Sequence, residues 1–200
     1  MRRLTLLLLV ALLLFGAVND VSAMIFGIRY SNLNQAVLPT FEDSDSRGRF
    51  GMFLGYREKN HDFVLGMDYD RHKTEMGDVK LYARRFSANI GYRYRLFPAD
   101  KISAMKINPY LGLYFFKSYG KVEAENWGWT DEEIQFEKDM LNDSGGWLSL
   151  GGEYYFAPGF SMGCEGGVRY TKASSKATGI EIKITDYTTF ASILMTFYWK

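Results

Sequence analysis

The chain is poor in the residues that cross-link a protein, bend its backbone or give it a net charge. Its only cysteine, Cys164, cannot form a disulfide within the chain, and we expect it to pack as a small apolar side chain. Only four prolines occur among 200 residues, and the one that falls in a strand pattern described below, Pro109, lies at the start of its strand. Lysine and arginine number 24 against 23 aspartate and glutamate, so no excess charge attracts nucleic acid and no nucleic-acid partner is expected.

Motifs that hold cofactors or metals are missing as well. The sequence has no glycine-rich phosphate loop, no zinc-ligand spacing and no nucleophile elbow. Its acidic residues do not follow the spacing of a calcium loop. We therefore expect neither a cofactor nor a metal.

Long apolar runs are absent after the first 23 residues. Those residues begin with Arg2 and Arg3, continue through an apolar run over 6–15 and end in small residues at 21–23, as a secretory signal peptide does. The alternative is an inner-membrane anchor, but the run falls short of the roughly 20 residues that a helical span needs. The sequence thus predicts a cleaved signal peptide at 1–23 and one exported domain at 24–200.

Alternation with a period of two fills the exported domain. One face of each segment carries aliphatic and aromatic side chains, and the other carries glycine or charge, which is typical of a strand between lipid and a polar interior. The last segment ends the chain, so its edge must pair with an earlier strand, and in lipid that requires a closed barrel. The predicted strands cover 24–31, 49–57, 63–70, 81–97, 108–117, 147–156, 160–170 and 188–200.

The connections alternate between short and long. Short turns are predicted at 59–61, 98–106 and 157–159, and longer polar connections at 32–48, 71–80, 118–145 and 172–187. Outer-membrane barrels have this asymmetry, with short periplasmic turns and long extracellular loops. We predict an all-β, eight-stranded, antiparallel, up-and-down transmembrane β-barrel.

The register of 180–187 is open at this stage. Ile180, Ile182 and Ile184 share the parity of the inward face of the last strand. Either a bulge near Asp186 resets the register, or these residues form a hairpin above the membrane with its own facing. We favour the hairpin because Gly179 and the preceding serines supply its turn.

The inward face predicts a network of paired charges. A soluble lipocalin-like barrel would have to bury these charges in a dry core, which is too costly without pairing. Glu165 and Arg169 lie four apart on one strand, within reach of Glu153, and form either a salt-bridge gate or, as we favour, a charge-paired plug. The predicted network comprises Arg29, Arg49, Asp68, Asp70, Arg93, Arg95, Glu153, Glu165 and Arg169.

These features together resemble the small eight-stranded outer-membrane barrels of the OmpA/OmpX-like superfamily. The stretch Asn-Pro-Tyr-Leu-Gly-Leu at 108–113 is similar to a strand opening in that superfamily. The resemblance implies the outer membrane of a Gram-negative-type bacterium, with lipid, periplasmic chaperones and the barrel-assembly machinery as partners. Family members usually end on the aromatic residue, whereas here Lys200 follows it. The residues that match the assembly signal are Ile193, Met195, Phe197 and Trp199.

Some barrels of this architecture are lipid A-modifying enzymes that use a histidine with a serine and an acidic partner. The two histidines here are His61, in a predicted periplasmic turn, and His72, near the outer rim with no serine nearby in its strand. General-base catalysis needs the nucleophile within hydrogen-bond reach of the histidine. The periplasmic turn is the wrong end for this chemistry, so we expect no role for His61, a solvated rim histidine at His72 and no catalytic residues.

The connection at 118–145 is the most distinctive exposed segment, with eight acidic and two basic side chains and a net charge of −6. It also carries Trp127, Trp129 and Phe136, which serve either as a surface for an extracellular ligand or host surface, or as packing within the connection. We expect a non-catalytic structural or surface-interaction protein of the cell envelope. The alternatives are a narrow gated channel, a lipid A-modifying enzyme and a soluble periplasmic binding protein.

Overall fold

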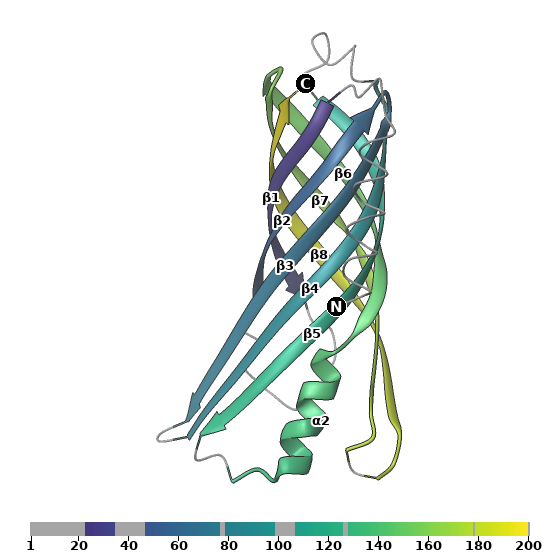
Figure 1. Ribbon diagram of the computed structural model, residues 1–200. Coiled ribbons are helices and arrows are strands. Elements are labelled where there is room, and N and C mark those ends of the chain that lie inside the picture. The colour runs from purple at the N-terminus through teal and green to yellow at the C-terminus, as the bar shows by residue number, and fades with distance from the viewer. Residues whose placement is uncertain are drawn as a thin grey trace, which may run out of the picture.

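The chain forms a closed β-barrel in which every strand pairs with its neighbours in sequence and β1 closes onto β8 (Figure 1). The computed structural model describes residues 23–34, 47–76, 79–98, 107–125, 128–177 and 179–199. All pairings are antiparallel, so the predicted eight-stranded up-and-down barrel is confirmed. The predicted signal peptide lies almost wholly outside the described residues and stays a prediction. The elements are β1 (Ala23–Asn34), β2 (Arg47–Glu58), β3 (His61–Met76), β4 (Val79–Arg95), β5 (Ile107–Glu125), α2 (Asp131–Leu141), β6 (Ser144–Ala157), β7 (Phe160–Ser175) and β8 (Ile182–Trp199).

The two ends of the barrel differ in the connections that they carry. At the turn end, Lys59 and Asn60 join β2 to β3, and Pro158 and Gly159 join β6 to β7. Lys59 takes a positive φ of 52°, as the first residue of a type I′ or II′ hairpin turn does. At the opposite end, here called the extension end, β3, β4 and β5 run well past the barrel body and α2 lies beside them (Figure 1).

Aromatic side chains form a row around the outside near the extension end. Tyr30, Phe50, Tyr69, Phe86 and Tyr119 pair in succession across β1 to β5, and all five are exposed. Their common parity explains the row, because partners directly opposite each other in an antiparallel sheet point to the same face.

A second aromatic row lies toward the turn end, where Tyr56, Phe63 and Tyr92 pair across β2 to β4. Their rings touch in sequence, with centroids 5.5 Å apart for the first pair and 5.3 Å for the second. Between the two rows the same strands expose aliphatic side chains, such as the paired Leu54 and Leu65. The outside is therefore an apolar belt bordered by aromatic rings.

Three connections that we predicted as long polar loops are mostly regular structure. β3 and β4 continue to within two residues of each other, β5 runs to Glu125 and leads to α2, and β7 and β8 extend through most of 172–187. The loop prediction was wrong there because the extensions lie beyond the apolar belt and carry polar residues such as Lys121, Glu123 and Lys172 at outward positions, so their sequence lacks the alternation that marks the barrel strands. The helix α2, the only one in the described residues, is too short and too polar to cross a membrane.

The isoleucines at 180–184 follow neither of the two predicted arrangements. Asp186 pairs with Thr171 and Ile184 pairs with Ala173 in an unbroken register, so there is no bulge. The hairpin does rise beyond the barrel, but it keeps the parity of β8. The side of the hairpin that continues the inner face of β8 faces α2, and Ile182 on that side lines a groove together with Phe136.

Inside the barrel, large rings lie directly over glycines of neighbouring strands. The ring of Tyr114 covers Gly91, and the ring of Phe53 covers Gly27. The Tyr114 ring is fixed from its other side by Trp147, stacked at 4.5 Å with an interplanar angle of 11°. A narrow barrel accommodates these rings only where the facing position has no Cβ.

We predict that Gly91→Val destabilises the folded barrel by about 1–3 kcal/mol, because the new side chain overlaps a ring that cannot move away. Urea unfolding of the refolded protein, followed by tryptophan fluorescence, measures the change. Gly152→Ala is the matched control, since a Cβ there meets nothing closer than 4.0 Å. Equal unfolding midpoints for both variants would show that the ring is not tightly held.

Candidate functional site in the barrel lumen

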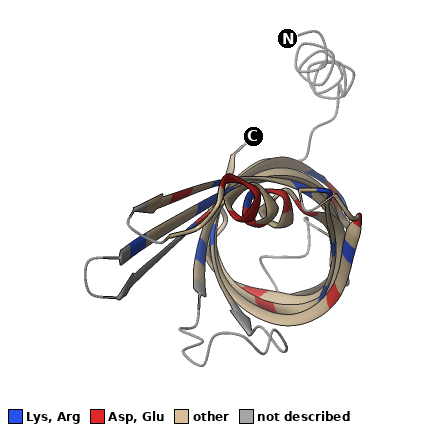
Figure 2. Cartoon of the chain, turned by 90° about the horizontal axis from the view of Figure 1, so that it is seen from below, with Lys and Arg blue, Asp and Glu red and all other residues tan. Residues whose placement is uncertain are grey.

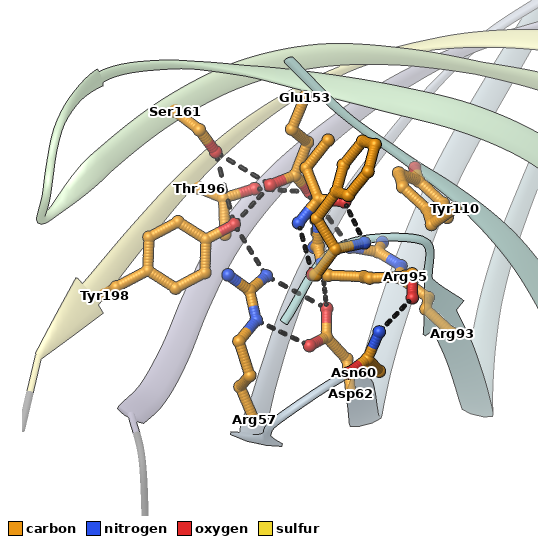
Figure 3. A network of polar contacts seen from close by, with 12 residues as sticks. Arg57, Asn60, Asp62, Arg93, Arg95, Tyr110, Glu153, Ser161, Thr196 and Tyr198 are labelled. Carbon is orange, nitrogen blue, oxygen red and sulfur yellow. Dashed lines mark hydrogen bonds and ion pairs between the residues drawn. The ribbon is translucent and has the colours of Figure 1, made fainter. Parts of the chain in front are cut away.

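The lumen near the turn end is filled by a network of buried charges, here called the turn-side network (Figure 3). Asp62 lies at its centre. Its carboxylate accepts hydrogen bonds from Nε of Arg57 at 2.7 Å and from Nε of Arg95 at 2.6 Å. Alternation places these residues: Arg57 and Asp62 face each other across the β2–β3 pair, and Arg95 enters from β4. The members are Arg57, Asp62, Arg93, Arg95 and Glu153.

Glu153, on β6, is the second anionic centre of the turn-side network. One oxygen accepts Arg95 Nη2 at 3.0 Å and lies 3.5 Å from Arg93 Nη1. The other accepts Ser161 Oγ at 2.8 Å and the Tyr198 hydroxyl. The carboxylate is fully buried, so these donors replace the water that it loses.

The middle of the lumen combines an ion pair with aromatic packing. Arg29 donates to both oxygens of Asp68, at 2.7 and 3.0 Å, and Asn89 donates to the same carboxylate at 3.0 Å. The guanidinium of Arg29 also lies 5.1 Å from the centroid of the Trp147 ring. Arginine suits this position, because its planar group serves a carboxylate and an aromatic face together.

Toward the extension end, charges of the lumen meet the end of α2. Asp143 directly follows the helix, is 2% exposed, and accepts Arg85 Nη1 at 3.4 Å. Arg85 also donates to Asp70 at 2.9 Å. Viewed along the barrel from this end, α2 lies over one side of the opening (Figure 2). The residues Arg49, Asp70, Arg85, Asp143 and Arg169 are here called the extension-side network.

A cap begins α2, and polar contacts near its C-terminal end hold it against the barrel. It begins with a capping box in which Thr130 and Glu133 bond each other's backbone amides. Beyond its end, Asn142 accepts the amide of Gly120 at 2.9 Å. Along the helix, Asp139 accepts Ser175 Oγ at 2.8 Å. The helix therefore spans from β5 to β7 with polar contacts on both sides.

The structure places all nine charges of the predicted network on the inner face and buries each of them. It does not bring together the three residues for which we expected mutual contact. Oε1 of Glu165 lies 3.6 Å from Nη1 of Arg29, and its Oε2 accepts a hydrogen bond of 3.0 Å from the Tyr110 hydroxyl. The guanidinium carbon of Arg169 lies 3.6 Å from the centroid of the Phe116 ring. Glu153 belongs to the turn-side network instead. The expected contact was wrong because inward side chains reach across the lumen to other strands more readily than along their own.

Four members of the two networks were not in the predicted set: Arg57, Asp62, Arg85 and Asp143. Asp62 shares the parity of Asp68 and Asp70, and this signal was sufficient to find it. Asp143 has no such signal, because its burial depends on where α2 ends.

A groove beside α2 brings two of the predicted loop residues together. It has a volume of about 300 Å³ and is lined by Trp129, Glu133, Phe136, Glu137 and Ile182. Trp127, the third candidate, lies outside the described residues. The groove thus combines an apolar floor with two carboxylates.

The histidines do not assemble a catalytic site in the described residues. Nδ1 of His61 lies 2.6 Å from the Tyr92 hydroxyl, and its ring packs edge-on against Tyr94 at 5.6 Å. The side chain of His72 lies outside the described residues. In the described parts of the chain, no three histidine, cysteine or acidic side chains are grouped as metal ligands. Cys164 is exposed on the outer face of β7.

The assembly-signal residues form one face of the closing strand. Ile193, Met195, Phe197 and Trp199 all lie on the outer side of β8 and are exposed. The ring of Phe197 packs against the rings of Phe26 and Phe160 on the two neighbouring strands, with centroids 6.3 and 5.2 Å apart. Their role in assembly stays a prediction.

Comparison with known proteins finds similarity in structure only. No family model and no curated protein matches the chain. Solved structures similar to it include Neisserial surface protein A (13% identity, 89% of this chain and 96% of that one, TM-score 0.44) and Ail of Yersinia pestis in complex with the heparin analogue sucrose octasulfate (11%, 88% and 95%, 0.43). The N-terminal β-barrel domain of Pseudomonas aeruginosa OprF is similar at 9% identity, covering 88% and 97% with a TM-score of 0.44. At these identities the likeness is one of fold alone.

We predict that Glu153→Gln destabilises the barrel by about 3–5 kcal/mol, because it leaves Arg93 buried without its counter-charge and leaves Arg95 with Asp62 alone. Urea unfolding of the protein refolded in lipid vesicles measures this change.

The control for this prediction is Glu123→Gln, which removes an acid of the same type from exposed pairs with Lys121 and Arg84. Exposed pairs contribute little, so the control should unfold like wild type. If Glu153→Gln also unfolds like wild type, the turn-side network does not hold the fold together.

Proposed function

We propose that this chain is a non-catalytic barrel protein of the bacterial outer membrane, with a closed lumen and an interaction surface at its extension end. The observation that carries the proposal is the reversed distribution of side chains. Arginines and carboxylates are buried inside, while leucines, isoleucines and phenylalanines are exposed around the whole barrel. A protein in water would expose such an apolar surface at a large cost, whereas hydrocarbon matches it.

The two aromatic rows support the same proposal. Tyrosine and tryptophan rings favour the boundary between hydrocarbon and headgroups, where one edge is apolar and the other is wet. Here the rows border an aliphatic belt on β2 and β3 that includes Leu54 and Leu65. The turn end then faces the periplasm and the extension end faces the outside, as short and long connections do in such barrels.

The side chains inside the barrel favour a closed lumen over a channel. Arg93, Arg95, Tyr110, Tyr114 and Glu153 are at most 1% exposed, which supports a lumen without a continuous water path. An eight-stranded barrel has an interior just wide enough for side chains to fill. Opening a path would require breaking several charge-assisted hydrogen bonds at once.

We expect the refolded mature chain to need detergent or lipid, to shift in gel mobility only after heating, and to give no steady conductance in a planar bilayer. Heat modifiability reports the folded barrel and conductance reports the lumen, so the two measurements separate membrane insertion from closure. Large stable channels would contradict the closed lumen. A monomer freely soluble without detergent would contradict the membrane location.

The groove beside α2 supports an interaction surface. Trp129 and Phe136 provide aromatic area, and Glu133 and Glu137 place negative charge at its rim. Aromatic rings with nearby carboxylates favour cationic groups through both charge and ring faces. We propose that its partner is a basic peptide segment with apolar residues.

We predict that Phe136→Ala weakens binding of such peptides by about tenfold, which corresponds to ~1.4 kcal/mol. The measurement is binding of the vesicle-embedded barrel to an array of peptides that combine lysine or arginine with leucine. Gln135→Ala is the control on the same helix, since Gln135 is exposed and does not line the groove. Equal binding by wild type and Phe136→Ala would exclude the groove, and heat modifiability of both variants shows that they are folded.

A further inference from the structure

A small cavity lies in the lumen, apart from the groove beside α2. It measures about 20 Å³ and is lined by Arg29, Ser31, Arg49, Asp68, Trp147, Arg169, Phe190 and Ser192. A single water-sized species needs at least about 10–15 Å³. The cavity therefore fits a species as small as one water or a monatomic ion, and it excludes phosphate or sulfate.

Hydrogen-bond donors without partners gather around this cavity. None of the three guanidinium nitrogens of Arg49 makes a hydrogen bond to the described residues, although the side chain is only 3% exposed. Its nearest carboxylate oxygen, on Asp70, is 3.9 Å away. Nη2 of Arg169 and the indole nitrogen of Trp147 also have no hydrogen-bond partner there. Buried donors of this kind call for an acceptor.

The two serines of the lining add another donor, and Ser31 pairs directly with Arg49 across β1 and β2. Ser31 and Ser192 share one hydrogen bond of 2.7 Å between their hydroxyls. Whichever hydroxyl donates in that bond, the other keeps its proton for a further acceptor. Ser31 and Ser192 pair across the β1–β8 seam that closes the barrel.

Acceptors at the cavity are already in use. Asp68 is the only carboxylate in the lining, and its two oxygens receive Arg29 and Asn89. The carboxylate oxygens of Glu165 and Asp143 that lack a hydrogen bond belong to side chains outside the lining. The lining thus carries three cations and one anion. Almost all of its polar atoms that lack a hydrogen-bond partner are donors.

We propose that this cavity binds one small monovalent anion of halide size, held between the guanidinium groups of Arg49 and Arg169. The anion accepts from both arginines and from the free serine proton, and it offsets the repulsion between two buried cations. A water molecule accepts at most two hydrogen bonds and adds no charge, so it serves this set of donors less well. The proposal does not depend on the interaction surface at α2.

The test compares unfolding of the refolded barrel in sodium chloride and in sodium gluconate at equal ionic strength and pH. Because a ligand that binds only the folded state stabilises it in proportion to the logarithm of its concentration, the unfolding midpoint should rise with chloride and with bromide. Gluconate is too large for the cavity and should have only the general effect of salt. Equal midpoints in chloride and gluconate would overturn the proposal and leave the cavity to water.

Arg49→Met provides the decisive variant, because it keeps an unbranched apolar stem but removes the guanidinium group with its charge and donors. We expect chloride binding to weaken by at least about tenfold in this variant. Arg84→Met is the control, since Arg84 is exposed and pairs with Glu123 outside the lumen. An unchanged chloride dependence in Arg49→Met would also overturn the proposal.

A second measurement is independent of the variant's folding. Crystals of the wild-type barrel grown with sodium bromide should show an anomalous difference peak between Arg49 and Arg169. A peak there supports the site. Its absence, in crystals whose bromide concentration gives the full rise in the unfolding midpoint, would show that the halide binds elsewhere.

Discussion

Pairing of buried arginines with buried carboxylates is the interaction on which this structure depends. A guanidinium or a carboxylate that is buried loses its hydrogen bonds to water. It is stable there only if oppositely charged and polar groups of the protein replace them. Asp62 does so between Arg57 and Arg95, and Glu153 does so with Arg95, Ser161 and Tyr198. The partners of Glu153 come from β4, β7 and β8, so its set of contacts is complete only when the barrel is closed. Charge pairing and barrel closure therefore require each other.

Shape sets a second condition inside the same narrow lumen. Arginine side chains and tyrosine rings need room that an eight-stranded barrel can supply only where the opposite position is small. Gly91 gives that room to Tyr114, whose hydroxyl then accepts Nε of Arg93. The glycine, the ring and the charge are thus packed against one another, so a larger or smaller side chain at any of the three positions displaces the other two. The glycines are therefore needed for the charged side chains to fit inside the barrel.

Alternation along the strands was sufficient to predict the barrel, because every barrel strand separates a solvent-excluded polar face from an apolar one. It also placed Arg29, Asp68 and Glu153 inside the lumen. It could not assign partners, since Glu165 and Arg169 reach different strands although they share one face. Beyond the barrel the rule fails for a physical reason. The extensions lie beyond the apolar belt and pack in part on α2, so the boundaries of these elements depend on caps such as Thr130 and on contacts such as Asn142 with Gly120.

Asp143 links the two parts that these rules describe separately. It directly follows α2, which carries the groove side chains, and its carboxylate lies beside Arg85 and within 4.0 Å of Arg169. A shift of the helix would therefore move a buried anion relative to two buried cations, at a cost that grows as water is excluded. Conversely, the balance of charge in the lumen favours one position of the helix over others. The surface offered at the extension end is thus held in place by the ion pairs inside the barrel.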